Sequence, residues 1–236
     1  MVKIPYGTSH FESLIRQGYY YVDRTSYIEQ IENLGEKHIA YLRPRRFGKS
    51  LWISTLQHYY GLEHREKFAD LFGKLYIGQH PTPLAGSYLV LRFDFSGILT
   101  DTLETTYAGF LENVKASVGS FLVAYSRFFL PEDKAQVLDT DAPNTVLTRL
   151  FKLVQAKAGA HKIYVLIDEY DHFANELIAF HFNDYQQVVS RNGYVASFTK
   201  RSKRARARAW WIGSSSRGYR RSRWTASPRA STFPAT

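Results

Sequence analysis

The first clear pattern along the chain is a short apolar run, a polar turn and an amphipathic segment. The run covers 38–42, HIAYL, and the turn RPRRFG follows it directly. In 49–61, apolar and aromatic side chains such as Trp52 and Leu56 recur at helical intervals. This order predicts a strand, a loop and a helix.

Strands and helices continue to alternate further along. A second apolar run covers 88–95, and helical spacing returns over 107–122. We expect another helix after Asn144 as its N-cap. The unbroken run 163–167, IYVLI, is typical of a strand buried on both faces of a parallel sheet. The pattern predicts an α/β fold, a mostly parallel sheet flanked by helices, preceded by short helices within residues 1–37.

The basic charge of the chain lies almost entirely in residues 199–236. The chain has 31 Lys and Arg against 21 Asp and Glu, with a formal net charge of +10. Residues 199–236 hold 11 of the basic residues and no acidic one, which leaves residues 1–198 close to neutral. This segment is typical of a disordered basic tail, or of a nucleic-acid-binding arm with Trp210, Trp211 and Trp224 as stacking groups.

A shifted reading frame is a third interpretation of residues 199–236, and we favour it. The segment has no Leu or Val and is rich in Arg, Ser and Ala, as GC-rich coding DNA gives when read one base out of register. Trp has one codon, so Trp210-Trp211-Ile212 must be encoded UGG-UGG-AUx, and a one-base shift yields Val and Asp. A permissible back-translation contains VDRLFITGV, with strand-like and turn-like parts. We predict a lost base near Phe198.

The strongest candidate site is the polar turn with the start of its helix. Its residues are Arg43, Pro44, Arg45, Arg46, Phe47, Gly48, Lys49 and Ser50. A phosphate-binding loop needs inward backbone N–H groups at a helix start, a Lys for the phosphates and a hydroxyl for Mg²⁺. Gly48, Lys49 and Ser50 meet these needs. The full pattern G-x-x-x-x-G-K-S has Arg43 in its first place, and a bare GKS is also typical of an ordinary helix start.

Two carboxylates follow the last apolar run. Asp168 at the carboxyl end of that strand would hold Mg²⁺ through water, and Glu169 would orient or deprotonate an attacking water. Alone, such a pair is typical of a solvated loop. Combined with the turn at 43–50, it predicts a site for a nucleoside triphosphate, with ATP and Mg²⁺ as ligands.

Four segments resemble motifs of the bacterial AAA-ATPase-like family, whose P-loop domain is usually followed by a PD-(D/E)XK nuclease-like domain. They are IPYGTSHFESLIRQGYYYVDRTSYI, LRPRRFGKSLWISTL, VLRFDFSGI and YVLIDEYD, in order over residues 4–171. The family usually has RPRRFGKS instead of a full glycine-rich loop. The resemblance also implies a segment like VDRLFITGVSPVTLDSLTSGFN after the acidic pair, which the back-translated tail reproduces.

The resemblance implies a P-loop NTPase-like fold and a role for each site residue. Lys49 of the Walker A-like loop would contact the β- and γ-phosphates. Ser50 and the Walker B residue Asp168 would serve Mg²⁺, and Glu169 would be the catalytic acid or base. Arg43, Arg45 and Arg46 are candidates to neutralise phosphates. Asp23 and Asp94 lie in family motifs but have no role that we can derive from sequence.

The frame hypothesis carries a structural consequence. In the sheet order expected for this class, the strand after Asp168 lies between the strands at 38–42 and 163–167. We expect LFITGV to be that strand and to be missing here, which removes roughly 7–15 kcal/mol of burial, the stability of a whole domain. Residues 1–198 would then be an incomplete AAA-ATPase-like domain with impaired ATP binding and hydrolysis, and residues 199–236 a disordered tail.

Other features narrow the function only slightly. The chain has no Cys, which excludes disulfides and thiolate metal sites and suits the cytoplasm. The eight histidines show no metal-ligand spacing, and we treat the string Glu132-Asp133-Lys134 as coincidence and not as a nuclease centre. No apolar run reaches the roughly 20 residues of a membrane span. The oligomeric state stays open. Alternatives to an ATPase are a nucleic-acid-binding protein and a non-catalytic interaction module.

Overall fold

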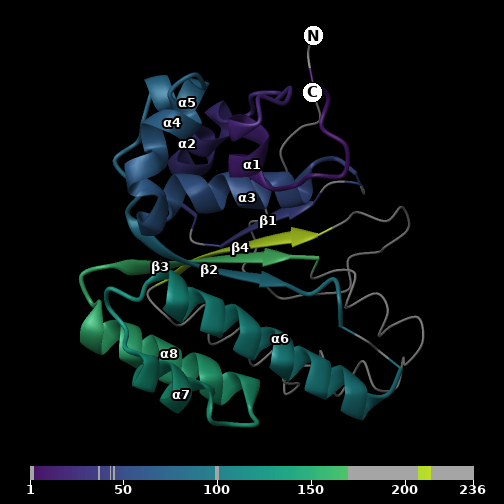
Figure 1. Cartoon of the computed structure of the whole chain (residues 1–236), viewed down its shortest axis with the longest axis vertical. Coiled ribbons are helices and arrows are strands. Elements are labelled where there is room, and N and C mark those ends of the chain that lie inside the picture. The colour runs from purple at the N-terminus through teal and green to yellow at the C-terminus, as the bar shows by residue number, and fades with distance from the viewer. Residues whose placement is uncertain are drawn as a thin grey trace.

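A parallel sheet lies between two helical layers (Figure 1). The computed structural model describes residues 3–36, 38–42, 44, 46–98, 101–169 and, as backbone, 207–213. Within these residues the sheet has four strands in the order β1-β4-β3-β2, all parallel. Their bounds are β1 His38–Leu42, β2 Tyr88–Asp94, β3 Lys162–Asp168 and β4 Ala207–Gly213. The α/β class predicted from sequence is confirmed.

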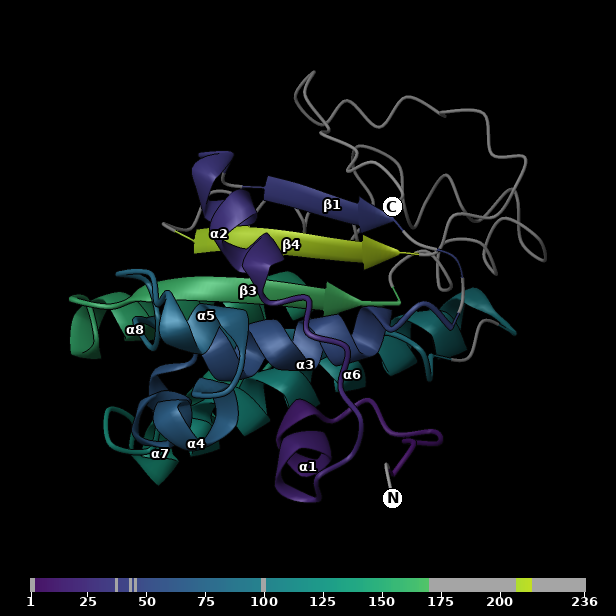
Figure 2. The ribbon, with the colours of Figure 1, turned by 90° about the horizontal axis from the view of Figure 1, so that it is seen from above.

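The helices divide between the two faces of the sheet (Figures 1 and 2). One face carries α1 Phe11–Arg16, α2 Ser26–Asn33, α3 Lys49–Tyr60, the 3₁₀ helix η1 Leu62–Lys67, α4 Phe68–Phe72 and α5 Tyr76–Gln79. The other carries α6 Leu103–Ala124, α7 Pro131–Leu138 and α8 Pro143–Lys157. None of these helices combines the length and the apolar character needed to cross a membrane.

Each face of the sheet has its own apolar core, because successive strand side chains point to opposite sides. Toward α6 and α8 the strands present Leu89, Leu91, Phe93, Ile163, Val165 and Ile167. Toward α3 they present Tyr88, Val90, Tyr164 and Leu166. Burial on both faces explains why these strands are mainly apolar, with Arg92 inside β2 and Lys162 at the start of β3 as the exceptions. Acidic residues stand at the carboxyl ends, where Asp94 of β2 pairs in register with Asp168 of β3.

The place in the sheet that the sequence analysis expected to be empty is occupied by another strand, β4, with the sequence ARAWWIG. Residues 207–213 pair with β1, from His38↔Ala209 to Leu42↔Gly213, and also with β3. A strand therefore lies between β1 and β3, and the expectation of an empty place there is wrong. A gap between β1 and β3 would leave the backbone N–H and C=O groups along one edge of each strand unpaired at the centre of the sheet. Any segment in extended conformation can form these hydrogen bonds through its own backbone, whatever its side chains are.

The predicted loss of burial assumed an empty place between β1 and β3, and the backbone of β4 occupies that place. The predicted loss of buried aliphatic side chains stays a prediction. Residues 170–206 and 214–236 lie outside the described residues. An out-of-frame origin for residues 199–236 therefore stays a prediction.

The start of α8 differs slightly from its predicted position. The helix begins at Pro143 with Ala142 as N-cap, whereas Asn144 was expected to cap it. Proline is favoured at the first helical position, because its fixed φ suits the helix and its missing N–H has no partner there anyway. The proline therefore decides the boundary, and Asn144 lies inside the first turn.

The string Glu132-Asp133-Lys134, which the sequence analysis treated as a coincidence, lies within α7. Asp133 accepts hydrogen bonds from the Leu130 backbone N–H at 2.8 Å and from the Lys157 ammonium at 2.5 Å. It therefore caps α7 and ties it to α8. These contacts give the residue a structural role.

Candidate functional site

The turn before α3 contains two residues in left-handed backbone conformation, Arg46 at φ 67° and Gly48 at φ 74°. Gly48 is the N-cap of α3. A Cβ on Gly48 would meet no atom within 4 Å, so the glycine is required by its backbone conformation and not by crowding. Arg46 holds a conformation that costs a non-glycine residue free energy, which is common where a loop is shaped for a ligand.

The residues of this turn differ sharply in exposure. Pro44, Arg46, Phe47 and Gly48 are exposed. Lys49 is only 5% exposed, although lysine is among the residues least often buried. The amino end of α3, with its unpaired N–H groups and partial positive charge, therefore lies beside an exposed loop. Arg43 and Arg45, two of the predicted phosphate contacts, lie outside the described residues.

The structure brings Asp168 to the start of α3, as predicted. Asp168 ends β3, is 1% exposed, and lies within hydrogen-bonding reach of the Ser50 hydroxyl. Its Oδ1 accepts a hydrogen bond from the Glu169 N–H at 3.1 Å. Its Oδ2 is buried without a hydrogen-bond partner among the described residues and stands 3.6 Å from Arg92 Nη2. A buried carboxylate oxygen in this state is suited to a cation or to a metal-bound water.

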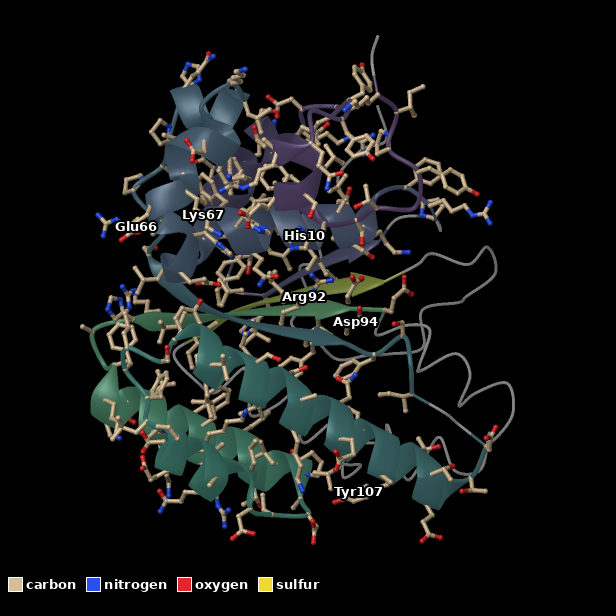
Figure 3. All side chains as sticks on the ribbon, in the orientation of Figure 1. His10, Glu66, Lys67, Arg92, Asp94 and Tyr107 are labelled. Carbon is tan, nitrogen blue, oxygen red and sulfur yellow. The ribbon has the colours of Figure 1, made fainter. Side chains whose placement is uncertain are left out.

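Burial raises the pKa of Asp168, and the neighbouring charges of Asp94 and Glu169 raise it further. The Ser50 hydroxyl and Arg92 act in the opposite direction. Figure 3 shows Arg92 and Asp94 on the strand β2, next to β3, with Asp94 toward its carboxyl end. Negative charge therefore accumulates at this edge of the sheet, which favours a bound cation.

Glu169 follows Asp168 directly and has a left-handed backbone, with φ 51°. A glutamate in this region is strained, and such strain clusters at functional sites. Its side chain is half-buried. The sharp turn places Glu169 beside Asp168 at the carboxyl end of the sheet, where the sequence analysis expected it.

A cavity of about 450 Å³ adjoins the loop. Arg46, Phe47, Gly48 and Trp52 line one side of it. The N-terminal segment lines the other side with Tyr20, Tyr21, Val22, Arg24 and Tyr27. The lining is mainly aromatic and aliphatic, and the volume falls within the range of small-molecule sites. Trp52 Nε1 is buried and has no hydrogen-bond partner in the described part of the chain. Sequence analysis did not foresee this cavity.

Asp23, which had no role derivable from sequence, holds the N-terminal segment in place. Its Oδ2 accepts a hydrogen bond from the Tyr76 N–H at 2.7 Å, and its Oδ1 accepts from the Thr25 N–H at 2.9 Å. The Thr25 hydroxyl in turn accepts from the Ile77 N–H at 3.1 Å. These bonds join the segment that lines the cavity to the start of α5.

A second cluster of polar side chains escaped the sequence analysis. Glu12, His58 and His64 each offer a ligand atom, and these atoms lie within 4.8 Å of one another. The sequence analysis found no metal-ligand spacing among the histidines, and this cluster does not depend on one. The two histidines match no standard spacing, and Glu12 comes from a different helix, so only the tertiary fold reveals the cluster.

A family model described as predicted AAA-ATPase matches residues 5–209. An uncharacterized protein in the vnfD 5′ region of Azotobacter chroococcum mcd 1 is 28% identical over 182 residues, which are 72% of this chain and 29% of that protein. The chain thus spans about three tenths of that relative. No solved structure matches. The family match covers the loop before α3 and the acidic pair after β3, and the chain belongs to the predicted AAA-ATPase family.

Proposed function

We propose that the chain binds a magnesium complex of a nucleoside triphosphate, ATP, at the amino end of α3, and hydrolyses it. The observation that carries this proposal is the meeting of Ser50 with Asp168. The two residues come from distant segments, and together they offer a hydroxyl and a buried carboxylate oxygen to one cation. Membership of the predicted AAA-ATPase family supports an ATPase-like function at the level of the family.

Different groups around the start of α3 would bind the phosphates and the metal ion. Backbone N–H groups at the start of α3 and the Lys49 ammonium would bind the β- and γ-phosphates. Exposed Arg46 would neutralise further phosphate charge. Ser50 and Asp168 would hold Mg²⁺, which would offset the charge of the triphosphate. The Oδ2 of Asp168 is buried without a hydrogen-bond partner among the described residues, 3.6 Å from Arg92 Nη2, and it fits that group.

The aromatic cavity next to the loop would take the base and ribose. Its walls include Phe47 and Gly48 of the loop itself, so a nucleotide with phosphates at α3 would reach it directly. Trp52 Nε1 is a buried donor without a partner among the described residues. A ring nitrogen or oxygen of the base would satisfy that donor, and the tyrosines would supply apolar contact.

Hydrolysis would require a group that orients water at the γ-phosphate, and we assign this role to Glu169. Its strained backbone holds it next to Asp168, at the same edge of the sheet. The impairment expected from sequence rested on an empty place in the sheet, which β4 fills. We therefore propose hydrolysis as well as binding.

The proposal is tested by calorimetric titration of MgATP into the chain and into Lys49→Ala, together with phosphate release. Lys74→Ala is the matched control, because Lys74 is an exposed lysine remote in sequence from the loop. We expect Lys49→Ala to lose binding by at least about tenfold, because a charge-assisted phosphate contact is worth about 1.5–3 kcal/mol. Equal MgATP affinity in the wild type, Lys49→Ala and Lys74→Ala would refute the site.

The nucleic-acid alternative receives no support from the described residues. Trp210 and Trp211, which that interpretation uses as stacking groups, belong to the central strand β4. The remaining basic residues of the tail lie outside the described residues. We therefore advance only the nucleotide proposal.

A further inference from the structure

Three metal-ligating side chains converge near the carboxyl end of α3, whose other end carries Lys49. Glu12 of α1, His58 of α3 and His64 of η1 offer ligand atoms within 4.8 Å of one another. His58 Nε2 and Glu12 Oε2 are 3.5 Å apart. Two ligands of a tetrahedral zinc ion, each about 2.0–2.1 Å from the metal, lie roughly 3.4 Å apart. This pair therefore already has the spacing of two ligands of one ion.

The hydrogen bonding of His58 leaves its Nε2 as an electron-pair donor. Its Nδ1 lies 2.7 Å from the Ser54 carbonyl oxygen, which can only accept, so Nδ1 carries the proton. Burial lowers the pKa of His58, which keeps the ring neutral. The bare Nε2 then faces the Glu12 carboxylate, and two electron-rich atoms face each other. A ring nitrogen bonded to a backbone carbonyl, with the other nitrogen on the metal, is the usual state of a ligand histidine.

His64 supplies a second neutral imidazole. Its ring stacks on that of His58, with centroids 4.2 Å apart. The pKa of His64 is lowered to about 4, and burial is the largest cause. The ring therefore carries no charge near neutral pH. Its Nδ1 is buried and has no hydrogen-bond partner within the described residues. Its Nε2 lies 3.5 Å from Glu63 Oε1, which favours a proton on Nε2 and a lone pair on Nδ1.

Glu12 is ionised and is held by two cationic side chains. Burial alone would raise the pKa of Glu12, but hydrogen bonds from Lys67 and Arg16 lower it to about 2. Lys67 Nζ lies 3.0 Å from Oε1 and 3.3 Å from Oε2. The Lys67 side chain is 43% exposed, so it can move to solvent. Figure 3 shows Lys67 and His10 in the helical layer that contains α1 and α3. Lys67 is thus an internal competitor for the same carboxylate.

We propose that Glu12, His58 and His64 form a binding site for a divalent transition-metal ion of the zinc class, with water completing its coordination. Two imidazoles and one carboxylate suit Zn²⁺, Co²⁺ or Ni²⁺ better than Mg²⁺, which prefers oxygen ligands. The bound ion would join α1, α3 and η1. This proposal uses none of the residues of the nucleotide site and stands independently of it.

The test is a Co²⁺ titration of the full chain, prepared without a histidine tag and treated with a chelator, followed by visible absorption in excess Mg²⁺. We expect saturable binding of one Co²⁺ with the spectrum of a tetrahedral site, and displacement by Zn²⁺. Saturating Zn²⁺ should also raise the unfolding temperature, because an ion that binds only the folded chain stabilises it. Absence of saturable Co²⁺ binding, or displacement of Co²⁺ by Mg²⁺ alone, would overturn the proposal.

Variants separate a built site from surface binding. Glu12→Gln and His64→Phe should each weaken Co²⁺ binding at least tenfold, and His64→Phe keeps a ring to stack on His58. Lys67→Met should tighten binding, because it removes the competing ammonium. His80→Phe changes an exposed histidine outside the cluster and should leave the affinity unchanged. Wild-type affinity in both Glu12→Gln and His64→Phe would contradict the assignment, as would weaker binding in Lys67→Met.

Discussion

Asp168→Asn should change stability and nucleotide binding in opposite directions. Asp168 is 1% exposed, and burial raises its pKa, so its ionised form is less favourable in the folded chain than in the unfolded chain. At neutral pH, above the unfolded pKa, this ionisation lowers the free energy of unfolding. Asn keeps the shape without the charge. We expect the variant without nucleotide to gain on the order of 1 kcal/mol, about 2–4 °C in unfolding temperature.

Nucleotide binding by the same variant should fall, because Asn cannot replace a carboxylate that holds Mg²⁺. Changing a residue that supports a bound metal ion typically lowers the affinity about 10- to 100-fold, and we expect a loss of about 100-fold in MgATP affinity here. At MgATP concentrations about 100 times the wild-type Kd, ligand stabilisation would drop from about 2.7 to about 0.4 kcal/mol. The rise in unfolding temperature caused by MgATP would then shrink from about 5–11 °C to about 1–2 °C.

The assay is thermal unfolding of both chains with and without MgATP. Asp70→Asn, a change at an exposed aspartate of α4, is the matched control and should behave like the wild type. An Asp168→Asn chain that keeps the full MgATP-dependent shift would refute the reasoning about the metal. A variant less stable than the wild type without ligand would refute the reasoning about the buried charge.

Further predictions concern the loop, the cavity, the acidic pair and α7. Glu169→Gln should keep MgATP binding and slow phosphate release by at least about 100-fold, the usual contribution of a positioned base, as measured by turnover and titration. Gly48→Ala should lower the free energy of unfolding in urea by about 1–2 kcal/mol, because it forces alanine into a left-handed conformation. Trp52→Phe should leave the unfolding temperature nearly unchanged and weaken MgATP binding by about 2–10-fold in calorimetry, one neutral hydrogen bond. The Lys157 hydrogen bond lowers the pKa of Asp133 below 3.8, so its stabilisation is present above pH 3.8 and is lost as pH falls through the lower folded value. Unfolding temperatures of Asp133→Asn should accordingly fall less on acidification than those of the wild type.

Much of the fold was predictable because its signals are local. The run at 163–167 and the helical spacing after Lys49 each reflect which face a side chain buries, and the structure confirms both elements. The meeting of Ser50 with Asp168 was also predictable, since carboxyl ends of parallel strands share one edge of a sheet. Local pattern was sufficient wherever the core alone decides the structure.

The rest depends on contacts that no local pattern encodes. β4 has the sequence ARAWWIG, which contains Arg and Trp and lacks the alternation of aliphatic residues that is typical of a strand. Its pairing depends on the backbone N–H and C=O groups that β1 and β3 present on either side of it. Glu12, His58 and His64 meet because three separate helices pack together. The cavity beside Trp52 forms between the N-terminal segment and α3, so its volume is a tertiary property.

The frame hypothesis is decided by the coding DNA around codon 198. We expect a second open frame that continues with VDRLFITGV-like sequence. In that frame LFITGV would begin at position 214, immediately after the residues that form β4. A single frame with no such continuation would reject the hypothesis and make residues 199–236 native sequence.

The most direct measurement of the central claim is a crystal structure of the chain with Mg²⁺ and a non-hydrolysable ATP analogue. The account predicts the β- and γ-phosphates at the amino end of α3 in contact with Lys49, and the metal between Ser50 and Asp168. Phosphates bound elsewhere, or a metal remote from Asp168, would contradict it.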